Sequence, residues 1–171
     1  NLALVLQAQG KLGEAVTSYG KAVELTPANA EAHCGLGTAL QDQGKHSAAM
    51  ASYRMAISLY PGYADAHSNL ATLLQKQGKL DAALTSYRKA LSLKPDSGIA
   101  HGNFGSVLQE IGEHDAAIKS LRHALALAPA YAIAPYALLF TLNYHPDKSA
   151  QEIFAAYREY DERVGVPLRS T

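Results

Sequence analysis

Three of the seven histidines, a residue type that commonly ligates metals, recur at one fixed spacing. His33, His67 and His101 are evenly spaced, and Cys34 directly follows the first of them. If each period is one helical hairpin, adjacent histidines lie on the order of 10–20 Å apart, because packed helices are about 8–10 Å apart. Zinc–nitrogen bonds are only about 2.0–2.1 Å long, so two of these rings could not share an ion. We therefore predict no metal site and no cofactor, and we interpret these histidines as packing residues.

No nucleophile of the chain has a predicted activating partner. Cys34 is the single cysteine, which excludes an intrachain disulfide and fits a reducing compartment such as the cytoplasm. No base is predicted beside its thiol, so we expect it to be inert or only mildly reactive. The chain also has no Gly-rich phosphate loop. These residues predict that the chain is not an enzyme by itself.

Charge and hydropathy exclude two further classes of partner. The chain has 15 Lys and Arg residues against 15 Asp and Glu residues, so its formal net charge is zero. A neutral chain has no electrostatic reason to bind nucleic acid or an anionic membrane. No apolar run approaches the roughly 20 residues that a membrane-spanning helix needs. We therefore expect a cytoplasmic protein whose partners are other proteins.

Four sets of small or turn-forming residues share the spacing of the histidines. They are Pro27, Pro61, Pro95 and Pro129; Gly10, Gly44, Gly78 and Gly112; Ala15, Ala49, Ala83 and Ala117; and Ala22, Ala56, Ala90 and Ala124. Proline ends a helix because it lacks the N–H and its ring clashes with the preceding turn. Glycine relieves a tight turn between two helices, and alanine lets two helices approach closely. The period predicts consecutive helical hairpins.

This pattern resembles the tetratricopeptide-repeat family, whose unit has about 34 residues and forms a helix–turn–helix. The resemblance implies an all-α, right-handed superhelix of antiparallel hairpins, an α-solenoid. Numbered so that Pro61 is position 32, the chain has a truncated unit at 1–29, complete units at 30–63, 64–97 and 98–131, and a degenerate tail at 132–171. The family's usual Trp at position 4 is replaced by the three histidines.

The tail begins like another hairpin, with a first helix that we expect from Ala132 to about Leu142, and then departs from the repeat. Ser149 and Glu152 have the spacing of a capping box, which predicts a last helix to about Val164. We expect Ile153, Tyr157, Tyr160 and Val164 to share one face of it. This helix either caps the array or links it to a further domain.

The segments from Leu138 to Asp147 and from Ser149 to Phe154 resemble the region that joins repeats to catalysis in bacterial O-GlcNAc-transferase-like proteins. The repeat segments from Ala66 to Ala71 and from Gln77 to Leu80 are similar to the repeats of the same family. The resemblance implies that a catalytic domain follows Thr171. The catalytic residues of the family would lie in that domain, so none is expected within this chain. The alternative is a freestanding adaptor with no associated enzyme.

The resemblance also implies that the first helix of each hairpin, helix A, lines a concave groove through positions 2, 5, 6, 9, 12 and 13. Position 6 holds Asn1, Gly35, Asn69 and Asn103, and position 12 holds Gln7, Gln41, Gln75 and Gln109. An amide can pair with both N–H and C=O groups of an extended peptide. The predicted peptide-binding residues are Asn69, Asn103, Gln41, Gln75, Gln109, Thr38, Thr72 and Asp65.

Other interpretations of the groove residues stay open. The amides could instead cap helices or bridge neighbouring ones, and Glu31 and Asp65 could simply face solvent. Basic residues that would clamp a peptide carboxylate are missing from the groove positions except for Lys76, so we predict no such clamp. The truncated first unit leaves apolar surface uncovered, which predicts self-association through that end.

Overall fold

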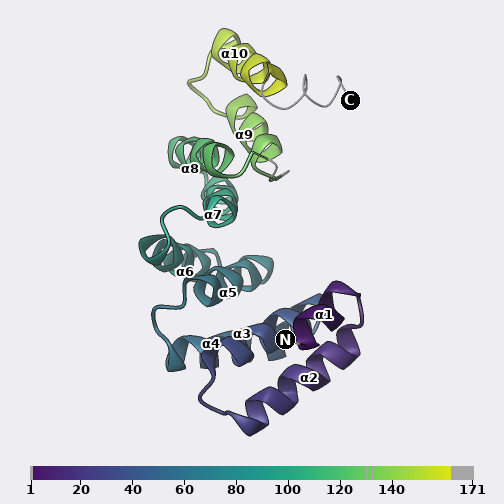
Figure 1. The fold of residues 1–171 in the computed structure, drawn as a ribbon. Coiled ribbons are helices and arrows are strands. Elements are labelled where there is room, and N and C mark those ends of the chain that lie inside the picture. Colours follow the sequence, from purple (N-terminus) through teal and green to yellow (C-terminus); the bar gives the residue numbers. More distant parts are fainter. Residues whose placement is uncertain (1, 130, 132, 163–171) are drawn as a thin grey trace. The chain divides into compact units, whose positions relative to one another are not determined.

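The computed structural model describes residues 2–129, 131 and 133–162 of the chain. Within these ranges it contains ten α-helices and no strand, which confirms the predicted all-α hairpin fold. The chain divides into two compact units, Asn1–Leu93 and Lys94–Thr171, and each is described below by itself (Figure 1).

The first unit consists of three helical hairpins. Its helices are α1 (Leu2–Ala8), α2 (Leu12–Leu25), α3 (Ala30–Asp42), α4 (His46–Leu59), α5 (Ala64–Lys76) and α6 (Leu80–Leu93). The two helices of each hairpin pack on one another, and α2 and α4 also pack on the helix that follows them. Odd-numbered helices are thus the A helices of the repeat, and even-numbered ones are its B helices.

The predicted turns have the backbone geometry that their glycines permit. Gly10, Gly44, Gly78 and Gly112 all have φ between 71° and 82°, a left-handed conformation that other residues rarely adopt. After α3, the Gly44 N–H donates to Gln41 O at 2.8 Å and the Lys45 N–H donates to Leu40 O at 2.9 Å. This is a Schellman ending, which satisfies the last carbonyls of the helix. Each B helix ends two residues before its proline.

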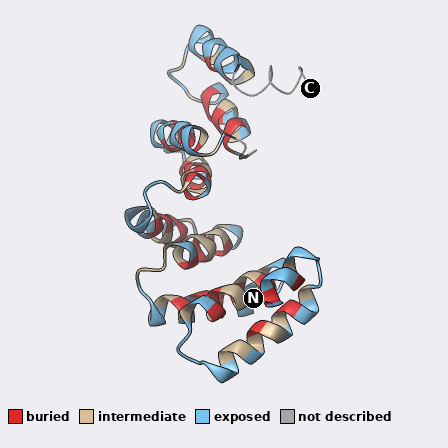
Figure 2. Cartoon of the chain, viewed as in Figure 1, coloured by how far each residue is buried: buried red, intermediate tan, exposed pale blue. Residues whose placement is uncertain are grey.

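The core lies between the paired helices, as the red faces in Figure 2 show. Ala15, Ala49 and Ala83 have no exposed area, and the rings of Tyr53 and Tyr87 beside them are also fully buried. The partner helix makes room for such a ring with a small residue, since a Cβ on Gly37 of α3 would lie 2.7 Å from the Tyr53 ring. A single hairpin offers little such volume, so stacking of hairpins supplies the rest of the core.

The second unit contains the last complete hairpin and the tail. Its helices are α7 (Gly98–Glu110), α8 (His114–Leu127), α9 (Ile133–Asn143) and α10 (Ala150–Tyr160). The predicted capping box is present at the start of α10, where Ser149 and Glu152 each bond to the other's backbone N–H. Among the described side chains of α10, Ala156 is buried, whereas Phe154 and Tyr157 are exposed. Val164 and the side chain of Tyr160 lie outside the described residues.

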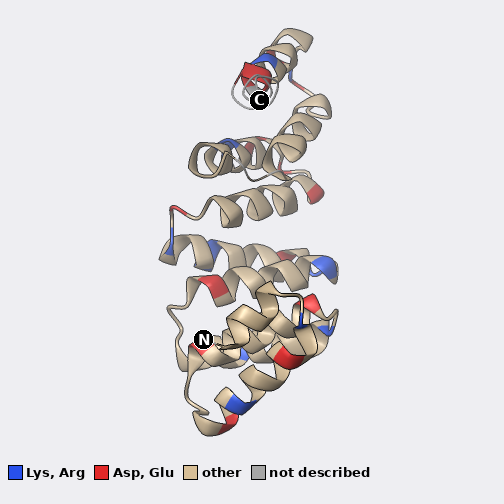
Figure 3. Ribbon diagram, turned by 45° about the vertical axis from the view of Figure 1, so that its right-hand side comes forward, with Lys and Arg blue, Asp and Glu red and all other residues tan. Residues whose placement is uncertain are grey.

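Charged side chains are spread over both units rather than gathered by sign (Figure 3). Acidic and basic residues occur together on α2, α5, α6, α8 and α10, as expected for a neutral chain. In the described part, no helix is both long enough and apolar enough to cross a membrane.

Candidate functional site

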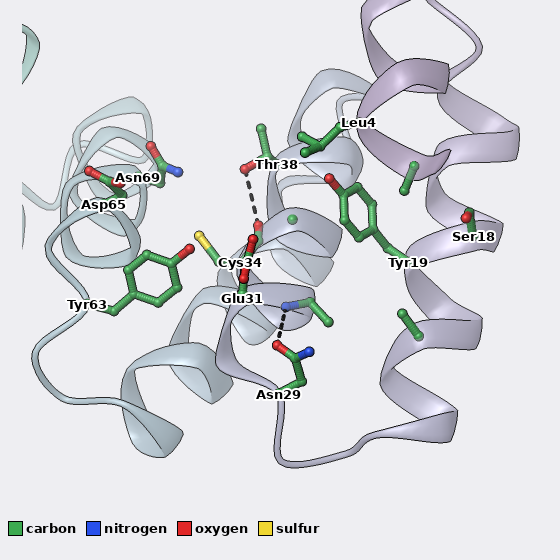
Figure 4. A pocket seen from close by; sticks show the side chains of 14 residues that line it. Leu4, Ser18, Tyr19, Asn29, Glu31, Cys34, Thr38, Tyr63, Asp65 and Asn69 are labelled. Atoms are coloured by element: carbon green, nitrogen blue, oxygen red, sulfur yellow. Dashed lines mark hydrogen bonds between the residues drawn. The ribbon is translucent and has the colours of Figure 1, made fainter. Parts of the chain in front are cut away.

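A pocket of about 390 Å³ opens between the A helices of the first unit. Figure 4 shows how its side chains converge from α1, α2, α3, α5 and the loop before α5. The fourteen lining residues are Ala3, Leu4, Ser18, Tyr19, Ala22, Asn29, Glu31, Ala32, Cys34, Gly35, Thr38, Tyr63, Asp65 and Asn69. Three predicted site residues, Thr38, Asp65 and Asn69, are therefore brought together here.

Cys34, Tyr63 and Asn69 lie near one another in the lining of the pocket (Figure 4). The Cys34 thiol is buried and forms hydrogen bonds with the side chains of Tyr63 and Asn69. Burial, only partly opposed by these hydrogen bonds, raises the pKa of Cys34 to about 11. The thiol is therefore protonated and unreactive at neutral pH. Cys34 therefore contributes packing and polar contacts here and not a nucleophile.

The gap in the asparagine series at position 6 has a steric cause. A Cβ atom on Gly35 would lie 2.3 Å from Cε1 of Tyr19, so the Tyr19 ring occupies the space that an asparagine there would need. Tyr53, the equivalent of Tyr19 in the next unit, has its hydroxyl 3.3 Å from Thr38 Oγ1. The matching position beside Tyr19 holds Leu4, which has no hydroxyl to hold the phenol within its own hairpin.

The predicted threonines and one glutamine are engaged by buried tyrosines. Tyr53 donates to Gln41 Oε1 at 3.1 Å, and the Tyr87 hydroxyl lies 2.9 Å from Thr72 Oγ1. Thr38 and Thr72 also donate to backbone carbonyls one turn earlier. The amide nitrogen of Gln41 keeps its two donors for another partner.

Gln75 and Asp65 also lie on α5. Gln75 is half-buried near the end of the helix, where its backbone carbonyl accepts a hydrogen bond from Gly78. Asp65 is exposed in the first turn.

The second unit holds Asn103 and Gln109 on α7. The Tyr131 hydroxyl donates to Asn103 Oδ1 at 2.6 Å, and the Tyr131 ring covers Gly102, where a Cβ would lie 2.6 Å from Cε1. Gln109 Oε1 accepts a hydrogen bond from Thr141 at 3.1 Å. Both amides thus use their oxygen within the unit and keep their nitrogen donors. Their binding roles stay predictions. Asn1 lies outside the described residues.

Sequence reasoning missed the tyrosines that shape these sites. Tyr63 and Tyr131 both occupy position 34, and each turns back over position 5 of its own repeat. The alternation of Asn29, Tyr63, Ser97 and Tyr131 at this position was the available signal. Asn29 and Ser97 instead cap the following helices through their side-chain oxygens.

Most groove positions at α9 are apolar or aromatic, which was also missed; the exception is Asn143 at position 12. Ile133, Tyr136, Phe140 and Tyr144 fall at positions 2, 5, 9 and 13, and all four are exposed. The Phe140 and Tyr144 rings stack with centroids 4.4 Å apart. The equivalent positions in the preceding repeats are mostly polar, so the chemistry of this surface changes at the tail.

The recurrent histidines have a repeated structural role. Nε2 of His33, His67 and His101 lies 2.9–3.0 Å from the carbonyl oxygen of Pro27, Pro61 and Pro95 respectively. A carbonyl can only accept, so Nε2 is the donor in each pair. Each ring thereby ties an A helix to the turn that precedes it. Among the described residues, no cluster of three or more His, Cys, Asp or Glu could hold a metal ion.

Comparisons with known proteins agree on the repeat. A model described as TPR repeat matches residues 3–44 and 39–78, and one described as tetratricopeptide repeat matches residues 62–130. No curated protein was found to match the chain.

Solved structures also match over nearly the whole chain. MamA is similar with a TM-score of 0.85 and 20% identity, covering 99% of this chain and 98% of that one. TTC0263 from Thermus thermophilus matches with a TM-score of 0.73 and 25% identity, covering 99% and 92%. YrrB, described as a TPR protein with an unusual peptide-binding site, matches with a TM-score of 0.75 and 23% identity, covering 96% and 84%.

Proposed function

This chain belongs to the tetratricopeptide-repeat family, and from that premise we propose that it binds extended polypeptide along its A helices. The observation that carries the proposal is the pocket of the first unit, where groove positions of α3 and α5 meet around Thr38, Asp65 and Asn69. Tetratricopeptide repeats generally bind proteins and do not catalyse reactions. The peptide-binding site of YrrB belongs to that protein, but its similar fold supports the same class of partner here.

Three of the predicted amides would offer hydrogen-bond donors to a client. In the second unit, Tyr131 occupies the oxygen of Asn103 and Thr141 that of Gln109. In the first, Tyr53 occupies the oxygen of Gln41. The amide nitrogens would therefore donate to backbone carbonyls of the client, which every peptide carries. This chemistry reads backbone rather than sequence and favours a broad range of clients.

The proposal is tested by the affinity of Asn69→Ala and, separately, Asn103→Ala for a panel of unrelated fluorescent peptides. Each lost hydrogen bond is expected to weaken binding by about 0.5–1.5 kcal/mol, by a similar factor for every peptide in the panel. Glu24→Ala, at an exposed position of α2 outside the pocket, serves as the control. Unchanged affinity in both asparagine variants would remove the amides from the binding site.

We further propose that the chain is the acceptor-holding arm of an O-GlcNAc-transferase-like enzyme. The tail motif supports this, and so does the packing of α10. That helix leaves a cavity of about 700 Å³ whose lining includes residues of α8 and α10, and Phe154 is 66% exposed. A following domain would cover this surface.

The alternative is a freestanding adaptor, which the similar folds of MamA and YrrB fit as well. The intact mass of the native polypeptide, isolated with an antibody to this segment, separates the two. A mass larger by a catalytic domain supports the transferase arm, whereas a product ending near Thr171 leaves the adaptor.

A further inference from the structure

Aromatic side chains gather on the exposed face of α9 in the second unit. Tyr136 is 70% exposed, Phe140 is 50% exposed, and Tyr144, which follows the last residue of the helix, is 67% exposed. Because they are spaced four residues apart, they follow one another along the same face, and the Phe140 and Tyr144 rings stack. No residue of α9 carries a charge. This face therefore presents accessible, uncharged rings to a ligand.

The aromatic face of α9 continues the predicted binding surface of α7. The two helices pack on each other (Figure 1), and Ile99 and Ile133, at position 2 of each, are both exposed. Near the start of α9, the Tyr131 hydroxyl donates to Asn103 Oδ1 at 2.6 Å. That bond engages the amide oxygen of Asn103. Its nitrogen, which can only donate, is the end of the amide left for a ligand.

Exposed aromatic rings beside a hydrogen-bond donor match the chemistry of a proline-rich segment. A proline has a carbonyl that accepts hydrogen bonds but no N–H to donate, so it suits the amide nitrogen of Asn103 and the hydroxyls of Tyr136 and Tyr144. Its apolar ring packs on aromatic side chains, which is how aromatic-lined surfaces bind proline-rich peptides. Such peptides are already shaped as polyproline II helices, so they lose little conformational entropy on binding.

We propose that the face formed by Tyr136, Phe140 and Tyr144 binds a proline-rich segment of the client in the polyproline II conformation, an inference that rests on the proposed peptide-binding function. The Tyr144 N–H still donates to Phe140 O, so the three rings follow helical geometry over about 12 Å. About four polyproline II residues have the same length. An acidic or basic segment would find no opposite charge on α9. The face thus adds a local preference for proline to the broad binding along the A helices.

The test uses N-acetyl-hexaproline amide as the probe, followed in two-dimensional amide NMR spectra of the full chain. At about 19 Å, this peptide is long enough to cover all three rings. We expect saturable shifts at the backbone amides of Tyr136 and Phe140 and at the side-chain amide of Asn103. A hexamer of alternating serine and alanine, with the same end groups, should bind about tenfold more weakly or worse, because it has no rings to pack on the aromatic face.

Variants of the exposed rings test whether the probe binds at α9. Tyr136→Ala and Phe140→Ala should each weaken hexaproline binding by about threefold to tenfold, as expected for the loss of one ring contact. Phe140→Leu keeps an apolar side chain but loses the ring, so it should weaken binding nearly as much. Phe154→Ala, which removes a phenylalanine of α10 that is also exposed, is the matched control and should leave affinity unchanged. Circular dichroism would verify that all four variants are folded, and a Phe140→Ala variant that binds as tightly as Phe154→Ala would overturn the proposal.

The same titrations separate this inference from the proposed function and from another occupant of the face. If hexaproline binds no more tightly than the serine–alanine hexamer, the preference for proline is wrong and general peptide binding stays intact. If hexaproline binds through Phe140 while no proline-free peptide binds, this surface stands and the proposed broad binding fails. Shifts at Tyr136 and Phe140 that depend on protein concentration without any peptide would show that a second copy covers the face, which would also overturn the proposal.

Discussion

Substituting Gly35 by alanine tests the packing that shapes the groove of the first unit. Gly35 lies inside α3, where replacing glycine by alanine normally stabilises a helix by about 1 kcal/mol. Here the new Cβ would lie 2.3 Å from Cε1 and 2.6 Å from Cζ of Tyr19. The ring cannot swing aside freely, since Tyr19 is only 4% exposed and belongs to the core cluster with Ala3, Leu6, Ala15 and Ala39.

The magnitude follows from two opposing contributions. Forcing an extra methyl group into a packed core costs about 1–3 kcal/mol, which offsets or exceeds the gain in helix propensity. Gly20, inside α2, provides the matched control, because a Cβ there meets nothing within 4 Å. Gly20→Ala should therefore stabilise the chain by about 1 kcal/mol. We expect Gly35→Ala to be less stable than Gly20→Ala by about 1–3 kcal/mol.

Urea unfolding followed by circular dichroism measures this difference in the free energy of unfolding. Because repeat arrays can unfold in parts, the slope of that free energy against urea concentration should also be compared between variants to detect a change in cooperativity. A double variant with Tyr19→Leu should remove most of the difference, since the ring is then gone. If Gly35→Ala stabilises the chain as much as Gly20→Ala does, the close approach of Tyr19 is wrong, and with it the reason for the gap in the asparagine series.

Four other features of the chain can each be tested by a single comparison. His67→Ala loses the bond to Pro61 O and should lower the free energy of unfolding by about 0.5–1.5 kcal/mol, whereas His46→Ala, at an exposed position, should change it by less than about 0.5 kcal/mol in urea unfolding. Burial lowers the pKa of His101 below 6.5; the hydrogen bond to the Pro95 carbonyl opposes this shift, and His123 adds a smaller contribution to it. Below pH 6.5 the unfolded chain therefore binds more protons than the folded chain, so the free energy of unfolding should fall as the pH falls from 6.5 towards the folded pKa. Urea midpoints of His101→Gln should depend less on pH in this range than those of the wild-type chain. Cys34, with its pKa raised to about 11, should react with iodoacetamide far more slowly in the folded chain than in urea, and equal rates would contradict its burial. Leu2 and Val5 of α1 are 67% and 53% exposed, so Leu2→Ser with Val5→Ser should reduce self-association in light scattering, and a wild-type chain that is monomeric at high concentration would contradict this surface.

The helices could be predicted from the sequence because their limits depend on local backbone chemistry. Gly44 and Gly78 adopt the left-handed conformation that ends an A helix, and Pro61 ends a B helix, whatever surrounds them. The capping box of Ser149 and Glu152 is equally local. Repetition of these signals once in every repeat then indicates how the helices pair.

The site could be predicted only in part, because it depends on which side chains turn into the groove. Asn69 and Thr38 follow from the repeat register. Tyr63 does not, since its direction is set by contacts with Cys34 across the hairpin. The bonds from the histidines to proline carbonyls likewise require the turn and the next A helix to be already packed. Such contacts between elements cannot be predicted from the spacing of the sequence repeat alone.

The central claim is that client polypeptide lies along the A helices, and a spin-labelled peptide tests it most directly. Its nitroxide broadens amide signals of nearby residues in the NMR spectrum of the chain. We expect broadening at α3 and α5, around Gly35, Thr38 and Asn69, with α4 and α6 much less affected. Broadening concentrated on the B helices, or spread evenly over the surface, would contradict the account.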